Sequence, residues 1–98
     1  MQTRGDGEPV YVISVAAQLT GMHPQTVRLY ERLGLVCPQR VSNRNRMYSD
    51  EDIRRLNKIR EFTRIGVNLA GVEVILRLLE RVEDLELELA QVRAGLRP

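Results

Sequence analysis

The chain has 98 residues and contains few of the groups that catalytic and metal sites require. It has one cysteine and one histidine, so it offers neither an internal disulfide nor a cluster of metal ligands. An enzyme would need a nucleophile with a base, or a metal constellation, and Cys37 with His23 supplies neither. Only four residues are aromatic, which argues against a large aromatic-lined pocket. The sequence therefore predicts a non-enzyme that has no cofactor, no metal and no small-molecule ligand.

Long apolar runs are also missing. No segment reaches the length of a membrane span, and the N-terminus has no charged-then-apolar signal segment. The hydrophobic content of 43% is sufficient for the core of one small domain with an appendage. We therefore expect a cytoplasmic protein that is not associated with a membrane.

Charge is distributed unevenly, although the net formal charge is only +2. Residues 21–48 hold five arginines against one glutamate, a net charge of +4. Residues 73–98 hold six acids against four arginines, a net charge of −2. The basic segment predicts contact with a polyanion, and the acidic segment predicts a different role.

Two short helices are predicted, one just before the basic segment and one at its start. Residues 15–20 end at Gly21, and the next helix starts with Pro24, which suits a first helical position, and ends before Gly34. This layout is typical of a helix-turn-helix motif, whose second helix enters a DNA major groove, although an ordinary helical hairpin would give the same pattern. Helical spacing places Val27, Tyr30 and Glu31 on the inner side. The outer side holds Gln25, Arg28, Leu29 and Arg32.

The segment before these helices is predicted to be a disordered tail over residues 1–9, followed by a β-prone run over residues 10–13. That run forms either an edge strand or an extended lead-in. Ser14 stands where a helix N-cap is expected. Ala16, Ala17 and Leu19 supply the apolar side of the first helix.

Residues 35–48 are predicted to form a two-stranded hairpin with a polar, basic tip over residues 42–45. Such a hairpin beside a helix-turn-helix motif is a wing, and its arginines would meet phosphates next to the groove. The alternative is an unstructured basic loop.

A third helix is predicted to start after Ser49. Its hydroxyl can cap the helix, with Asp52 in the place of a capping-box glutamate. One face of this helix continues up to Gly66, and it comprises Ile53, Leu56, Ile59 or Arg60, and Thr63. Asn68 can then cap a fourth helix.

The fourth helix carries aliphatic residues that alternate in steps of three and four. They are Ile75, Leu78, Val82, Leu85, Leu89, Val92 and Leu96. This spacing is typical of a coiled-coil seam and gives a length of roughly 33 Å. A second stripe, which comprises Leu69, Val72, Leu76 and Leu79, would pack against the domain core. The chain has no other helix of that length to cover the seam, so we expect a homodimer in preference to a monomer that folds back on itself.

These elements, in this order, resemble the MerR family of bacterial transcription regulators. The resemblance is carried by Tyr11-x-Ile13, Ala16, Leu19, Gly21, Pro24-x-Thr26-Val27-Arg28-x-Tyr30-Glu31, Gly34-Leu35, Pro38-x-Arg40, Arg46-x-Tyr48-Ser49, Asp52, Leu56, Ile59, Gly66 and Leu69. Residues 11–17, 21–23 and 66–71 are more narrowly similar to the HspR branch of heat-shock repressors. The resemblance implies an inverted-repeat operator of double-stranded DNA, an antiparallel dimer and an Hsp70-type chaperone as co-repressor.

The expected fold is mostly α with a small β-hairpin. It comprises a winged helix-turn-helix DNA-binding domain over residues 10–72 and a C-terminal dimerisation helix over residues 73–98. The residues expected to contact DNA are His23, Gln25, Thr26, Arg28, Tyr30, Arg40, Asn43, Arg44, Arg46 and Tyr48. Gln25, Thr26 and Arg28 would enter the groove, and the wing residues would bind phosphates. His23 would meet a phosphate or only cap its helix. Tyr30 would direct its hydroxyl to a phosphate or lie wholly in the core.

A heat-shock repressor is the favoured function. The alternative is a MerR-like activator or an architectural DNA-binding dimer without a small-molecule effector. An adaptor that binds only proteins would not need the charge of +4 on the recognition helix and wing.

Overall fold

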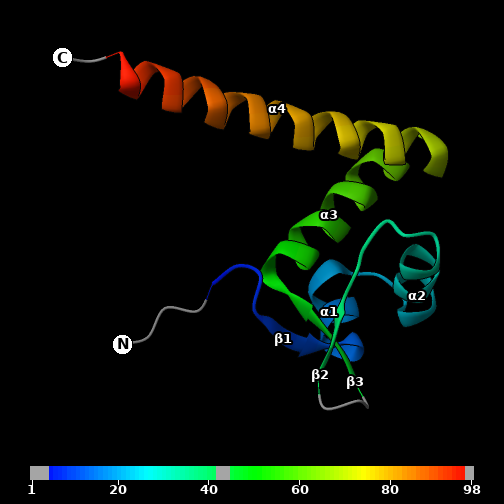
Figure 1. Ribbon diagram of the computed structural model, residues 1–98. Helices are drawn as coiled ribbons and strands as arrows, with labels where there is room; N and C mark the ends of the chain where they lie inside the picture. The colour runs from blue at the N-terminus through cyan, green and yellow to red at the C-terminus, as the bar shows by residue number, and fades with distance from the viewer. Residues whose placement is uncertain (1–4, 42–44, 97–98) are drawn as a thin grey trace. The chain divides into compact units, whose positions relative to one another are not determined.

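The computed structural model describes residues 5–41 and 45–96 of the chain (Figure 1). The chain divides into two compact units, Met1–Glu61 and Phe62–Pro98. The first unit holds the sheet, the helix-turn-helix pair and most of the third helix. The second holds the long C-terminal helix.

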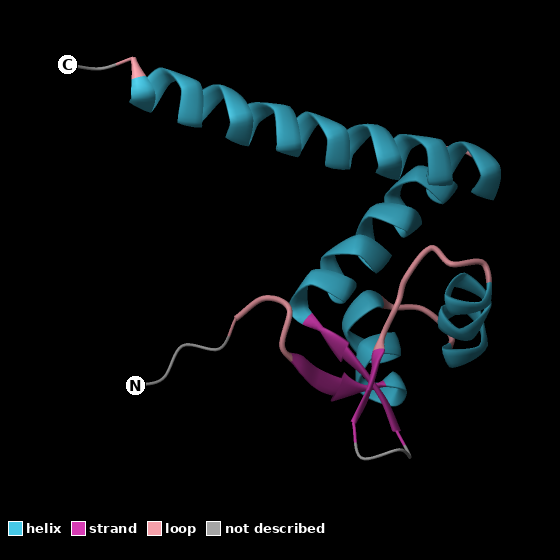
Figure 2. Ribbon diagram, in the orientation of Figure 1, coloured by secondary structure: helices cyan, strands magenta, loops and turns pink. Residues whose placement is uncertain are grey.

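The sheet has three antiparallel strands in the order β1-β3-β2 (Figure 2). They are β1 (Pro9–Val12), β2 (Gln39–Val41) and β3 (Asn45–Ser49). The predicted hairpin of β2 and β3 is confirmed. The β-prone run before the first helix, expected to be either an edge strand or an extended lead-in, is an edge strand, β1, which pairs with β3. Leu35 and Val36, which precede the hairpin, are buried loop residues and not strand residues.

Helix α1 (Ile13–Thr20) follows β1 without a linker. Its N-cap is Val12, which forms no side-chain capping bond, so the predicted cap at Ser14 is wrong. The strand itself brings the chain into the helix, and Ser14 therefore falls inside the first turn. Leu19 is 53% exposed, whereas Thr20 is buried and its hydroxyl donates to the Ala16 carbonyl at 2.8 Å.

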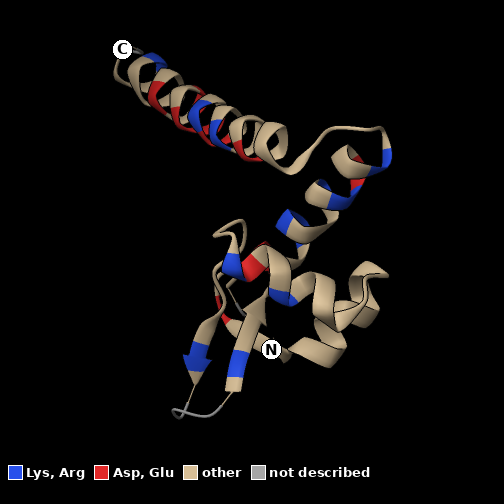
Figure 3. Cartoon of the chain, turned by 90° about the vertical axis from the view of Figure 1, so that its right-hand side faces the viewer, with Lys and Arg blue, Asp and Glu red and all other residues tan. Residues whose placement is uncertain are grey.

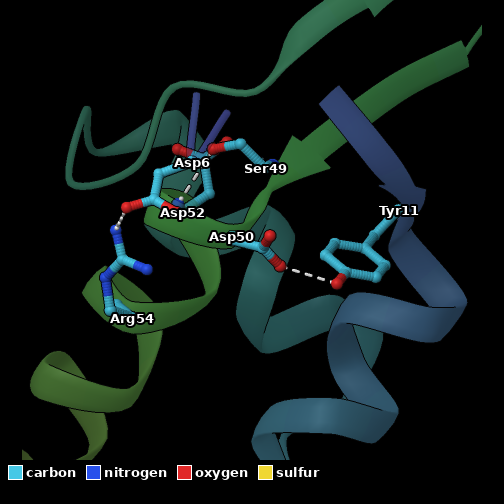
Figure 4. Close-up of polar contacts among 6 residues, drawn as sticks. All are labelled: Asp6, Tyr11, Ser49, Asp50, Asp52 and Arg54. Atoms are coloured by element: carbon cyan, nitrogen blue, oxygen red, sulfur yellow. Dashed lines mark hydrogen bonds and ion pairs between the residues drawn. The ribbon is translucent and has the colours of Figure 1, made fainter. Parts of the chain in front are cut away.

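Helix α3 (Asp50–Arg64) begins with the predicted capping box. The Asp52 backbone N–H donates to Ser49 Oγ at 3.1 Å, and the Ser49 N–H donates to Asp52 Oδ2 at 3.0 Å (Figure 4). Tyr11 from β1 donates its hydroxyl hydrogen bond to Asp50 at 2.6 Å. The start of α3 is thus joined to the sheet by side chains as well as by the chain.

The segment that precedes β1 also contacts α3. Arg54 donates to the Asp6 carboxylate at 2.9 Å (Figure 4), and the Glu51 N–H donates to the Asp6 carbonyl at 3.0 Å. Pro9, assigned by the sequence to the tail, is the first residue of β1.

Among the described residues of the first unit, the buried side chains come from both helices of the helix-turn-helix pair, the loop after them, β3 and α3, and none comes from β1 or β2. They are Ala16, Ala17, Thr20, Val27, Tyr30, Leu35, Val36, Tyr48, Ser49, Leu56 and Ile59. Two arginines of α3 bind backbone carbonyls of the helix-turn-helix region: Arg60 donates to Thr20 at 2.7 Å, and Arg55 donates to Leu35. The recognition motif is therefore attached to the helix that follows the wing.

In the second unit, α4 (Leu69–Gly95) is one continuous helix. Asn68 caps it as predicted, because Asn68 Oδ1 accepts from the Gly71 N–H at 2.8 Å. Within the predicted core stripe, Val72 and Leu76 are buried, whereas Leu79 is exposed. From Leu78 to Leu96, each member of the predicted seam is between 45% and 78% exposed.

Candidate nucleic-acid interface

Helix α2 (Pro24–Arg32) is the predicted recognition helix, and His23 fixes its start. The Gln25 N–H donates to His23 Nδ1 at 3.1 Å, so the capping role considered for this histidine is confirmed. A neutral imidazole that accepts at Nδ1 carries its proton on Nε2. The exposed His23 ring therefore keeps one donor for an external group such as a phosphate.

The two sides of α2 are those predicted. Val27 is fully buried and Tyr30 is only 8% exposed, so most of the tyrosine ring belongs to the core. The opposite side is open to solvent, and its exposed residues are Gln25, Arg28, Leu29 and Arg32. Thr26 is half-buried between the two sides. The outer side combines an amide, guanidinium groups and an aliphatic side chain, which are the groups that contact base edges and thymine methyl groups.

The wing places two arginines directly opposite each other. Arg40 on β2 pairs with Arg46 on β3, and both are exposed; positive charges on the two strands are visible in Figure 3. Like charges at opposed positions of an antiparallel pair destabilise it, so a negative charge close by stabilises the wing. Asn43 and Arg44, predicted at the tip, lie outside the described residues.

A cavity of about 330 Å³ lies between the wing and the recognition helix. Its lining residues are Val12, Ile13, Arg28, Arg40, Asn45, Arg46 and Tyr48. Three predicted DNA contacts, Arg28, Arg40 and Arg46, thus come together from three elements, α2, β2 and β3. This arrangement can hold phosphate oxygens, because guanidinium groups bind them with paired N–H donors.

One residue of this site was not predicted. The Glu31 carboxylate binds Arg46, with 3.0 Å between Nε and Oε1 and 3.2 Å between Nη1 and Oε2. Glu31 is the sole acid among residues 21–48, and that isolation was the available signal in the sequence.

The predicted phosphate contact of Tyr48 is wrong. Its side chain is fully buried, and among the described residues its hydroxyl has no hydrogen-bond partner. Burial, followed by the negative charge of Glu31, raises the pKa of Tyr48 to about 12. Tyr48 therefore supports the wing from inside.

Three further observations concern the described part of the chain. No group of three or more His, Cys, Asp or Glu side chains in it is placed to hold a metal ion. None of its helices combines the length and apolar character that crossing a bilayer requires. Cys37 is exposed and free.

Comparison with known proteins identifies related sequences. The family described as MerR HTH family regulatory protein matches residues 11–79. A Streptomyces coelicolor protein named as a heat shock protein, HspR, is 49% identical over 89 residues, which cover 90% of this chain and 59% of that protein. The mercuric resistance operon regulatory protein of Bacillus cereus is 35% identical over 72% of this chain and 54% of its own length. The chain thus spans a little over half the length of these relatives.

Solved structures give the same fold. PbrR691 from Ralstonia metallidurans CH34, in complex with lead(II), superposes with a TM-score of 0.69 at 27% identity, over 88% of this chain and 74% of that one. HiNmlR, a regulator that lacks the sensor domain and is bound to promoter DNA, superposes with a TM-score of 0.63 at 22% identity, over 88% and 77% of the two chains. The HiNmlR likeness concerns the fold alone.

Proposed function

Because the chain belongs to the MerR family and is a DNA-binding transcriptional regulator, we propose that it represses heat-shock and chaperone genes. The observation that carries this proposal is the 49% identity to the protein named HspR, which extends over 90% of the chain. A match of that length includes the recognition helix, the wing and the part of the proposed dimer seam from Ile75 to Leu85, whichever end of the chain it leaves out.

The proposed target is an inverted repeat bound by a homodimer. Seven aliphatic side chains along α4 would meet a second copy, as coiled-coil seams do. Two recognition helices related by two-fold symmetry then match two half-sites of opposite orientation. Gln25, Thr26 and Arg28 would face base edges, while His23 and Arg40 would bind phosphates. We also propose that Asn43 and Arg44 contact phosphates and that residues 10–72 form the DNA-binding domain.

Footprinting of the purified protein across chaperone promoters, combined with in vitro transcription, tests this function. A protected inverted repeat and reduced transcription are the expected results. Protection with increased transcription would identify the alternative, a MerR-like activator. Equal binding to all DNA would identify an architectural dimer.

The proposed co-repressor is an Hsp70-type chaperone that binds the C-terminal region of the regulator. Leu87, which is exposed and lies outside the seam, would provide an aliphatic contact in an acidic segment, and Leu96, the last residue of the seam, would provide a second one where α4 ends. The test is a gel shift with operator and chaperone, comparing the full chain with a form that ends near Gln91. Both forms must first be shown to be dimeric by sedimentation. The truncated form keeps Leu87 but lacks Leu96, so equal enhancement of a dimeric truncated form would rule out the contact at Leu96.

A further inference from the structure

The ion pair between Glu31 and Arg46 links the recognition helix to the wing. Two carboxylate oxygens face two guanidinium nitrogens at 3.0 Å and 3.2 Å, so the pair is bidentate and fixes the orientation of both side chains. The Glu31 side chain is only 18% exposed, and that of Arg46 is 47% exposed. The pair is therefore partly removed from solvent, where an ion pair is less screened than on an open surface.

The carboxylate also lies where the wing has an excess of positive charge. Arg46 stands opposite Arg40 in the strand pair, and both line the cavity together with Arg28. Glu31 neutralises one of these three charges and offsets the repulsion across the strands. Among the described residues, neither Arg28 nor Arg40 forms an ion pair, so these two remain available to DNA.

The same carboxylate acts on the inside of the wing. Its negative charge is one of the causes that raise the pKa of the buried Tyr48 phenol. Glu31 thus contributes to both the exposed arginine pair and the supporting core.

We propose that Glu31 is a positioning residue: through Arg46 it sets the spacing between the recognition helix and the wing, so that Arg28 and Arg40 reach one DNA segment together. Arg46 is held by Glu31 and contributes less to phosphate binding than a free wing arginine. This inference rests on the DNA-binding function.

Simple electrostatics and positioning make opposite predictions for Glu31→Gln. Removal of one negative charge from a DNA-facing surface strengthens binding to any DNA, so the affinities for operator and random DNA should rise by the same factor. Loss of positioning weakens the operator complex selectively, because operator binding requires helix and wing in register. We therefore expect random DNA to be bound more tightly and the operator less tightly.

The experiment measures fluorescence anisotropy of the full chain on an operator duplex and on a random duplex of equal length, over a series of salt concentrations. For Glu31→Gln, the ratio of operator to random affinity should fall by about tenfold, which corresponds to the loss of one good contact. The salt slope on random DNA should steepen by up to about one unit, because Arg46 is freed for a phosphate. Glu61→Gln is the matched control, since it removes the same charge from an exposed side chain that pairs only loosely with Lys58 at 3.9 Å.

Arg46→Gln provides the second variant and closes a double-mutant cycle. If the two residues act as a pair, Arg46→Gln reduces the specificity ratio to a similar extent, and the double variant is no worse than either single one. Additive losses would overturn the proposal. So would equal changes on operator and random DNA in Glu31→Gln, in either direction.

Folding is checked by circular dichroism for each variant, and Arg46→Gln supplies the measurement if Glu31→Gln does not fold. Failure of the proposed function gives a different result. In that case the unaltered protein would bind operator and random DNA equally before any substitution is made.

Discussion

Tyr48 brings a phenol into the fully buried part of the first unit without giving its hydroxyl a partner among the described residues. A buried hydroxyl without a hydrogen bond costs free energy, and the large ring offsets this cost by filling the space beneath the wing. Its cross-strand neighbour is Tyr11, on the edge strand. The residue is therefore a support for the wing whose ionisation should oppose folding.

Substitution of Tyr48 by phenylalanine should make stability less sensitive to alkaline pH. In the unfolded chain a tyrosine ionises near pH 10, whereas the folded protein keeps this proton to about pH 12. Between these values the folded state binds more protons, so unfolding becomes more favourable as pH rises, by roughly 1 kcal/mol or more for each unit. Urea unfolding should show that the free energy of unfolding falls less between pH 8 and pH 11 for Tyr48→Phe than for the unaltered protein. Identical losses would mean that the phenol is not the buried titrating group.

Arg28 and Arg40 should differ in the kind of DNA binding that they support. Arg28→Ala should cost roughly 1–3 kcal/mol on the operator and reduce discrimination, because an exposed arginine of the recognition helix can bind a base edge. Arg40→Ala should weaken operator and random DNA about equally and lower the salt slope by about one unit. Equal loss of discrimination in both variants would show that groove and phosphate contacts have been misassigned.

At the scale of the elements, the sequence was most informative where local chemistry decides the structure. The starts at Pro24, Ser49 and Asn68 and the end at Gly34 depend on capping within a few residues, and all four are confirmed. Ser14 and Leu19 were misassigned because β1 runs directly into α1 and rotates its buried side.

The candidate site also contains some features that local sequence determines and others that depend on packing between distant residues. The exposed side of α2 follows from helical periodicity alone. The Glu31–Arg46 pair and the burial of Tyr48 depend on how the wing packs against α2, across fifteen or more residues of sequence. No local pattern contains that information, although a lone acid in a basic segment pointed to it.

The turn between α1 and α2 should tolerate substitution less well than the turn after α2. Gly21 and Gly34 both have positive φ, 66° and 75°, so alanine costs about 1 kcal/mol of backbone strain at either position. At Gly21, however, the new Cβ would lie 2.7 Å from Arg60 Nη1, which donates to the Thr20 carbonyl, whereas at Gly34 it would meet nothing within 4 Å. Gly21→Ala should therefore cost about 1–2 kcal/mol more than Gly34→Ala in urea unfolding, since a hydrogen bond from a charged donor is displaced.

An Arg60→Ala background isolates the cause. There the two glycine substitutions should cost about the same, because the displaced guanidinium is absent. A persistent difference would show that the α1–α2 turn is constrained by something other than Arg60.

At the scale of the whole molecule, the two units have different surfaces. The first gathers arginines on the recognition helix and wing, while α4 carries both signs of charge (Figure 3) and a row of exposed aliphatic side chains. Single exposed aliphatics are ordinary on protein surfaces, but a heptad row on one helix is the pattern that partner helices cover. Its length suits a second copy of the same helix.

Leu85→Asp should therefore convert the protein to a monomer, since it places a carboxylate in the middle of the proposed seam. Leu85 is 45% exposed in the single chain, so the substitution should leave the first unit folded. Leu87→Asp is the matched control: it lies two residues along the same helix, is 61% exposed and stands outside the seam, so its effect on helix propensity is the same.

Sedimentation should show a monomer for Leu85→Asp and a dimer for Leu87→Asp. Operator affinity should fall steeply only in the first, because one recognition helix cannot hold two half-sites. A Leu85→Asp protein that remains dimeric, or a Leu87→Asp protein that dissociates as readily, would place the interface on another face of α4.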